Sequence, residues 1–124
     1  NYTEKNGYHH QHKHPNSFLS GTFWIQTNED DQVCFYKERF EQIKIYTDQP
    51  NEFTAEKHIF KAIENKLLLF PSHLLHAVEQ VNGEKRRISI AFNTFVRGTL
   101  GSYDGRSGIN LLWILKKSVL VVGQ

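Results

Sequence analysis

Residues 67 to 93 constrain the fold of this chain more than any other segment. They contain three short runs, LLLF, LLHAV and RRISIAFN, which are separated by Pro71-Ser72 and by Asn82-Gly83. Short apolar or alternating runs that end at turn residues are typical of β-strands, and Asn-Gly is a strong turn signal. The segment therefore predicts two strands and part of a third, joined by tight turns.

The same pattern continues in the rest of the chain. Strands are expected within residues 15–27, 33–37, 42–47 and 53–64, although the last range could also form a short helix. Residues 94–108 contain four glycines and no sustained period, which indicates a loop. About eight strand candidates, with turns about every 8–12 residues, predict an all-β sandwich or barrel of the jelly-roll kind.

Length and composition limit the classes of protein that need to be considered. A chain of 124 residues forms one domain, and its net charge of +2 comes without a basic stripe, so no nucleic acid partner is expected. No run is apolar and long enough for us to expect a membrane span, and residues 1–20 do not have the pattern expected of a signal peptide. The single Cys34 excludes an internal disulfide, and we expect a cytoplasmic protein.

The two ends of the chain carry separate expectations. The chain opens at Asn1 and contains no methionine, which predicts that its native N-terminus is missing. Residues 109–124 form an apolar extension that is split by Lys116-Lys117. This extension is expected to cover the core as a hairpin or edge strand, and it is a candidate homodimer surface.

Histidines are concentrated near the start of the chain. On an extended strand, His10, His12 and His14 would share one face, and His76 ends a distant apolar strand. A purification tag or solvated arm would explain the first histidine cluster. However, the cluster leads directly into a segment that is expected to form a turn and a strand. Histidines from two strands are the components of an open metal site, and imidazole ligands suit iron, zinc, copper or nickel. We therefore expect His12, His14 and His76 to bind a catalytic metal.

The last strand of the segment alternates strictly. One face carries a cation, a hydroxyl and an amide, and the other face is apolar and is expected to be core. The polar face consists of Arg87, Ser89, Ala91 and Asn93, and the apolar face of Ile88, Ile90 and Phe92. A buried arginine needs an anion, and its planar fork matches a carboxylate. The alternative is that Arg86-Arg87 is a solvated pair that follows a turn.

These motifs together resemble a family of 2-oxoglutarate-Fe(II) oxygenases found in marine phages and bacteria. The segments that carry the resemblance are HKHPNSFLSGTFW, LLLFPSHLLHAV and RRISIAFN, within about residues 9 to 100. The resemblance implies a double-stranded β-helix that holds Fe(II) at His12, His14 and His76. It also implies 2-oxoglutarate as co-substrate, with Arg87, Ser89 and Asn93 as its binding residues. The expected reaction is hydroxylation of a C–H bond.

The chain departs from the wider superfamily at one metal ligand. The usual triad has an aspartate or glutamate where this chain has His14. Either the site contains three histidines, or a carboxylate arrives from elsewhere in the chain and His14 supports it. His10 is a further candidate ligand.

Two other classes of protein remain open. A cupin-like metalloenzyme or small-molecule binding module would use the same histidines without 2-oxoglutarate, but it would have no need of Arg87 and Ser89. A structural β-sandwich would use its histidines only as polar residues. The substrate is expected to be a small molecule or a peptide, with Trp24 and Phe70 in the pocket wall.

Overall fold

The chain folds into β-strands, and the computed structural model describes residues 1–38, 47–49, 51–102 and 108–111. No described residue belongs to a helix, so none of them forms a helical membrane span. Within these ranges, ten strands make three antiparallel sheets. The first sheet contains β1 (Tyr2–Thr3), β8 (Arg87–Asn93), β3 (Leu19–Gln26) and β6 (Leu67–Pro71), in that order. The second contains β2 (His9–His12), β7 (His76–Val78), β4 (Gln32–Tyr36) and β5 (Lys57–Lys61). A separate hairpin joins β9 (Gly98–Leu100) to β10 (Ile109–Leu111).

The all-β prediction is confirmed, and most expected strands occur where the alternation placed them. Within residues 53–64, Lys57–Lys61 form strand β5 and no residue is helical. The prediction that residues 94–108 form a loop is wrong in part, because β9 lies within this range and pairs with β10. The strand expected at 42–47 and most of the apolar extension lie outside the described residues. The division into one domain stays a prediction.

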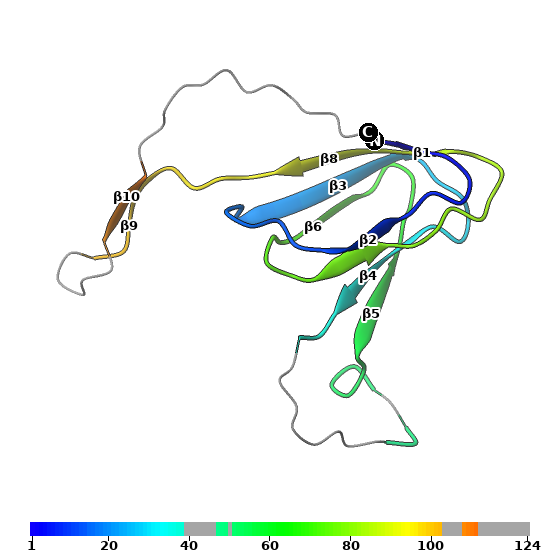
Figure 1. Cartoon of the computed structure of the whole chain (residues 1–124), viewed down its shortest axis with the longest axis horizontal. Coiled ribbons are helices and arrows are strands. Elements are labelled where there is room, and N and C mark those ends of the chain that lie inside the picture. The colour runs from blue at the N-terminus through cyan, green and yellow to red at the C-terminus, as the bar shows by residue number, and fades with distance from the viewer. Residues whose placement is uncertain (39–46, 50, 103–107, 112–124) are drawn as a thin grey trace.

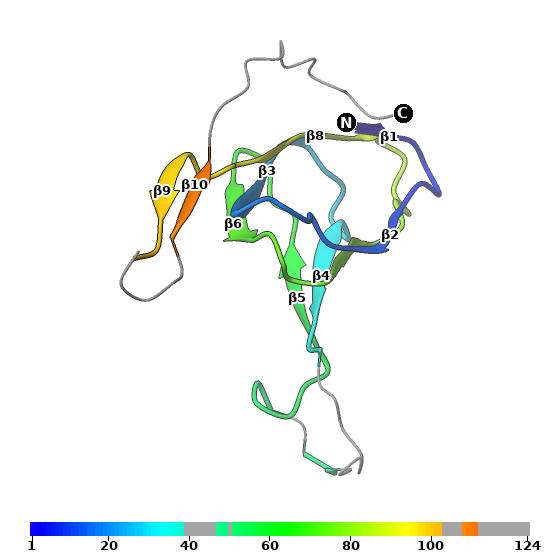
Figure 2. The same ribbon diagram turned by 60° about the vertical axis from the view of Figure 1, so that its left-hand side comes forward.

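The two larger sheets form two layers with the hydrophobic core between them (Figures 1 and 2). Buried apolar side chains from both layers make up this core: Trp24, Val33, Phe35, Ala62 and Phe70. Phe35 of the second sheet and Phe70 of the first pack edge to face, with ring centroids 4.9 Å apart. The apolar contacts occupy only part of the interlayer space, and polar residues line the rest.

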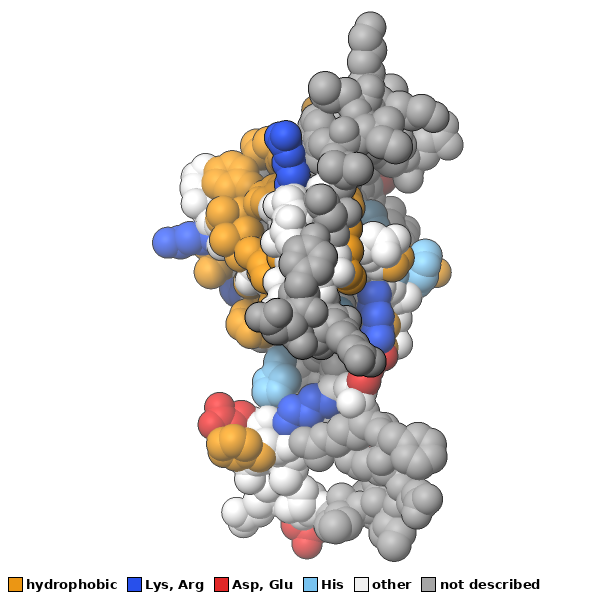
Figure 3. Space-filling view, turned by 90° about the vertical axis from the view of Figure 1, so that its left-hand side faces the viewer, with side chains coloured by type: hydrophobic (Ala, Val, Ile, Leu, Met, Phe, Trp, Pro, Cys, Tyr) orange, Lys and Arg blue, Asp and Glu red, His pale blue; other side chains and the backbone are white. Residues whose placement is uncertain are grey.

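The apolar face of β8 does not belong to this core, contrary to the sequence-based expectation. Ile90 and Phe92 are 54% and 39% exposed. In the sheet register they flank Phe23 and Gly21 of β3, with Leu67 and Leu69 of β6 on the far side. The three strands thus share an outward apolar face, because Trp24 and Phe70 already fill the inward positions. Figure 3 shows hydrophobic side chains gathered along one side of the molecule.

A β-bulge in β2 changes which histidines face the interior. His9 pairs with Val78 and His12 pairs with His76, with a register shift between them. His9 and His12 therefore both line the interlayer pocket, whereas His10 is exposed. The prediction that His10 shares a face with the candidate metal ligands is wrong, because it assumed a strand without a bulge.

Candidate metal centre and adjoining pocket

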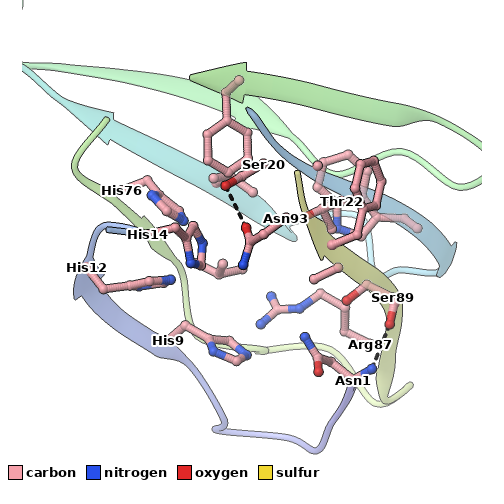
Figure 4. Close-up of a pocket in the computed structure, with 17 residues that line it drawn as sticks. Asn1, His9, His12, His14, Ser20, Thr22, His76, Arg87, Ser89 and Asn93 are labelled. Carbon is pink, nitrogen blue, oxygen red and sulfur yellow. Dashed lines mark hydrogen bonds between the residues drawn. The ribbon is translucent and has the colours of Figure 1, made fainter. Parts of the chain in front are cut away.

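A pocket of about 400 Å³ lies between the two sheets. Its wall combines histidines, small polar residues, one arginine and the apolar side chains Trp24 and Phe70. Strands β2, β3, β6, β7 and β8 all contribute, together with the segment that follows β2 (Figure 4). The pocket therefore brings together side chains that are far apart in the sequence.

Three histidines converge at one end of this pocket. One candidate ligand atom each from His12, His14 and His76 lies within 4.8 Å of the others. The ring of His76 has its centroid 4.3 Å from that of His12 and 5.1 Å from that of His14. His14 follows β2, and its backbone nitrogen donates to the Ser72 carbonyl at 3.0 Å. The histidines that the sequence nominated are thus together, in an arrangement that could hold a metal ion.

Backbone carbonyls orient two of these rings. His12 Nδ1 lies 2.7 Å from the His10 oxygen, and His76 Nδ1 lies 2.9 Å from the Leu74 oxygen. A carbonyl can only accept, so each Nδ1 carries the proton and each Nε2 keeps a free lone pair. This is the tautomer that presents Nε2 as a metal ligand, with its other nitrogen fixed by a second partner.

The pocket also favours the neutral form of two of the candidate ligands, His76 and His14. Burial lowers the pKa of His76 to about 4, against a smaller opposing contribution from its hydrogen bond to Leu74. Burial and the neighbouring His12 likewise lower the pKa of His14. Because the metal-binding form of imidazole is the neutral one, these shifts favour a metal ligand at neutral pH. Among the described residues, no carboxylate joins the three-histidine group.

Arg87 lies in the same pocket and is 2% exposed. Its Nη1 donates to Asp31 Oδ1 at 3.1 Å and to the Glu79 carbonyl at 3.0 Å. Burial lowers the pKa of Arg87, and Asp31 opposes that shift. A buried arginine was expected to need an anion, and Asp31 of the same chain is that anion.

The second amino group of Arg87 is different. Among the described residues, Arg87 Nη2 is the buried side-chain nitrogen or oxygen that has no hydrogen-bond partner. Leaving a buried donor unsatisfied is costly, by roughly 1–3 kcal/mol. Figure 4 shows the guanidinium directed into the pocket. This donor fits an acceptor that enters the pocket, such as a ligand carboxylate.

The sequence did not identify two residues of this region. Asp31 belongs to the acidic turn NEDDQ of residues 28–32, yet it is 1% exposed, and its Oδ2 accepts from the Asn28 backbone nitrogen at 2.7 Å. The requirement of a buried arginine for an anion was the signal that could have found it. His9 lines the pocket through the bulge of β2, which no sequence signal foretold. Burial, followed by the nearby Arg87, lowers the pKa of His9.

Three serines hold the Asn93 side chain at the pocket wall. Ser17 Oγ lies 2.7 Å from Ser72 Oγ, which lies 2.8 Å from Ser20 Oγ. Ser20 Oγ then donates to Asn93 Oδ1 at 2.7 Å. The network joins the segment after β2, strand β3, the end of β6 and strand β8. Polar residues of three separate sequence motifs thus form one structural unit.

Ser89 lines the pocket beside Arg87, as its place on the strand predicted. Its backbone nitrogen donates to the Asn1 carbonyl at 3.0 Å, and its carbonyl accepts from the Asn1 nitrogen at 2.7 Å. The backbone of Ser89 is therefore fixed by the first residue of the chain. The structure places Arg87, Ser89 and Asn93 on the pocket wall, but it does not test their binding roles.

The pocket thus offers neutral nitrogen ligands at one end and a buried guanidinium donor on its wall. A small acidic molecule could contact both a metal ion and Arg87. No curated protein matches the chain. The family model described as "Putative 2OG-Fe(II) oxygenase" matches residues 1–93, which include every histidine and pocket residue discussed above. The chain therefore belongs to this 2OG-Fe(II) oxygenase family.

Proposed function

We propose that the chain carries the active site of an Fe(II)- and 2-oxoglutarate-dependent dioxygenase that hydroxylates its substrate. The observation that carries this proposal is the combination of the three-histidine group with the unpartnered Arg87 Nη2 in one pocket. Membership of the family supplies the cofactors, and the two four-stranded sheets support the expected double-stranded β-helix.

Each part of the pocket has a separate role in this proposal. His12, His14 and His76 would hold the iron through their neutral rings. Arg87 Nη2, assisted by the Ser89 hydroxyl, would bind the far carboxylate of 2-oxoglutarate. When bound, iron and 2-oxoglutarate supply the oxidising power that hydroxylation of a C–H bond requires.

The apolar wall serves the same chemistry by excluding water. Trp24 and Phe70 are 3% and 7% exposed, and both line the pocket. In a site from which water is excluded, the attraction between a guanidinium and a carboxylate is stronger than in solution. The substrate, a cytoplasmic location and a homodimer remain predictions.

The ion pair between Arg87 and Asp31 also supports a second candidate function. Because Arg87 already has an anion, a cupin-like metalloenzyme or binding module could use the three histidines without 2-oxoglutarate. The two proposals differ in whether the metal-loaded pocket binds a 2-oxo acid.

The test is a titration of the metal-free protein with Fe(II) and then 2-oxoglutarate, without oxygen. A chelate of 2-oxoglutarate on iron gives a weak visible absorption band at about 500 nm. We expect this band with the wild type, and a weaker band with Arg87→Lys, which keeps a cation beside Asp31 but removes the forked donor. Arg86→Lys is the matched control, because Arg86 is an exposed neighbour that pairs with Glu4.

Each outcome of this titration has a definite meaning. If iron binds and no band forms, the candidate that works without 2-oxoglutarate is correct. If no metal binds to the histidines, both enzymatic proposals are wrong. His14→Ala should weaken metal binding, whereas His10→Ala should not, because His10 is exposed and lies outside the three-histidine group.

A further inference from the structure

Asp31 and Arg87 connect the histidine pocket to a second cavity. Arg87 lines the histidine pocket, whereas Asp31 lines a separate acidic cavity on the other side. Both side chains are almost completely buried, at 2% and 1% exposed, and their atoms Nη1 and Oδ1 are 3.1 Å apart. Asp31 therefore acts on the histidine pocket through Arg87 and does not line it.

Hydrogen bonds hold the Asp31 carboxylate in a fixed position. Asn28 donates to Asp31 Oδ2 from its backbone at 2.7 Å and from its side chain at 3.3 Å. The Asn28 amide also bridges both backbone groups of Lys85, at 2.7 and 3.1 Å. Oδ1 of Asp31 is thus the oxygen left for Arg87. The loop before β4 and the turn before β8 together fix the carboxylate behind the guanidinium.

The negative charge near the candidate metal centre lies in an unusual place. A centre with two histidines and one carboxylate places a negative charge directly on the metal. Here the three candidate ligands are imidazoles, which bind a metal in their neutral form, and the buried carboxylate pairs with the arginine. A divalent metal ion, the three neutral histidines, Arg87 and Asp31 together carry a total charge of about +2, by the ordinary charges of these groups. A dianion would bring that total to zero.

We propose that Asp31 is a charge-balancing residue, which supplies from behind Arg87 the negative charge that the three-histidine centre lacks at the metal. The metal-loaded pocket is thereby matched to a dianionic 2-oxo acid. Without Asp31 the pocket would carry one additional positive charge and would favour dianions more strongly. This inference rests on the proposed function, because it assigns the charge of the ligand that the same pocket binds.

The test measures the affinity for two probes in protein loaded with Zn(II), which is redox-inert. The probes are 2-oxoglutarate, a dianion, and 2-oxobutyrate, a monoanion without the far carboxylate, and both are titrated by calorimetry. For Asp31→Asn we expect the preference for 2-oxoglutarate over 2-oxobutyrate to rise about tenfold or more, because a unit charge is removed close to the far carboxylate. The ratio of the two affinities does not change when a variant weakens the binding of both probes equally.

A matched control and a second pair of variants keep the test decisive. Asp30→Asn is the matched control, because it removes the same charge from an exposed neighbour, where solvent screens it. If Asp31→Asn does not fold, the comparison of Arg87→Met with Arg87→Met/Asp31→Asn decides. Arg87→Met leaves the Asp31 carboxylate unpaired, and this charge repels the dianion. Compared with Arg87→Met, the double variant should therefore recover part of the preference for 2-oxoglutarate.

A preference that is unchanged or lower in Asp31→Asn, or no recovery in the double variant, would overturn the charge-balancing role. Failure of the proposed function gives a different result. In that case the Zn(II)-loaded wild type would not prefer 2-oxoglutarate over 2-oxobutyrate at all.

Discussion

Acidification should destabilise the metal-free protein through His76. This side chain is 3% exposed and packs against Phe70, with ring centroids 4.7 Å apart, so burial lowers its pKa from 6.5 to about 4. The unfolded chain therefore binds the proton more tightly than the folded chain. The stability contributed by neutral His76 is complete above pH 6.5 and is lost as the pH falls toward 4.

The size of the effect follows from the shift. One pKa unit corresponds to about 1.4 kcal/mol, so the full loss is about 3 kcal/mol and the loss between pH 7.5 and pH 5 is about 2 kcal/mol. His9 and His14 have pKa values lowered in the same direction and will add to the loss.

Urea denaturation at pH 7.5 and pH 5 would measure this loss as a change in the free energy of unfolding. His76→Gln removes the titrating ring and should flatten the profile, and His73→Gln serves as control because His73 is an exposed neighbour. The reasoning is refuted if wild type and His76→Gln lose the same stability over this pH range.

Three further substitutions test separate parts of the structure. Ser72→Ala removes a fully buried hydroxyl that contacts two other serines, so the free energy of unfolding should fall by about 1–3 kcal/mol in urea denaturation. In Gly83→Ala the new Cβ would overlap the side chain of Asn28, so a loss of about 1–3 kcal/mol is expected, and a midpoint equal to that of the wild type would contradict it. His9 lines the pocket near Arg87 and lies outside the three-histidine group. His9→Leu removes the polar ring atoms at a similar side-chain volume, so a metal titration should match that of the wild type while calorimetry shows weaker 2-oxoglutarate binding. Equal 2-oxoglutarate affinity would show that His9 does not contact the ligand.

Local patterns in the sequence predicted the strands well, because alternation and turn residues act over a few positions. The LLLF and RRISIAFN runs became β6 and β8, and the alternation of β8 did place Arg87 and Ser89 on the pocket side. The histidines converged as expected because β2 and β7 are neighbours in one sheet. The spacing of the histidines, together with the family resemblance that selected His12 and His14 over His10, thus predicted the three-histidine group.

The errors arose where neighbouring elements decide the outcome. Alternation shows that a strand has two faces, but which face meets the core depends on the adjacent strands, and β3 and β6 turned Ile90 and Phe92 outward. A bulge adds one residue without any clear mark in the sequence, so His9 replaced His10 at the pocket. Asp31 was missed because an acidic residue in a turn is usually exposed, and only the burial of Arg87 gives it a partner.

The candidate metal centre and the hydrophobic core share the space between the same two sheets. Phe70 contacts Phe35 in the core and His76 in the histidine group, with ring centroids 4.9 and 4.7 Å apart. This packing lowers the pKa of His76, so the ring resists a proton but keeps its lone pair for a metal ion. A ligand that binds only the folded chain stabilises it by mass action, so metal binding should raise the stability of the whole sandwich. A metal ion held by the three histidines would therefore stabilise the fold as well as serve the proposed chemistry.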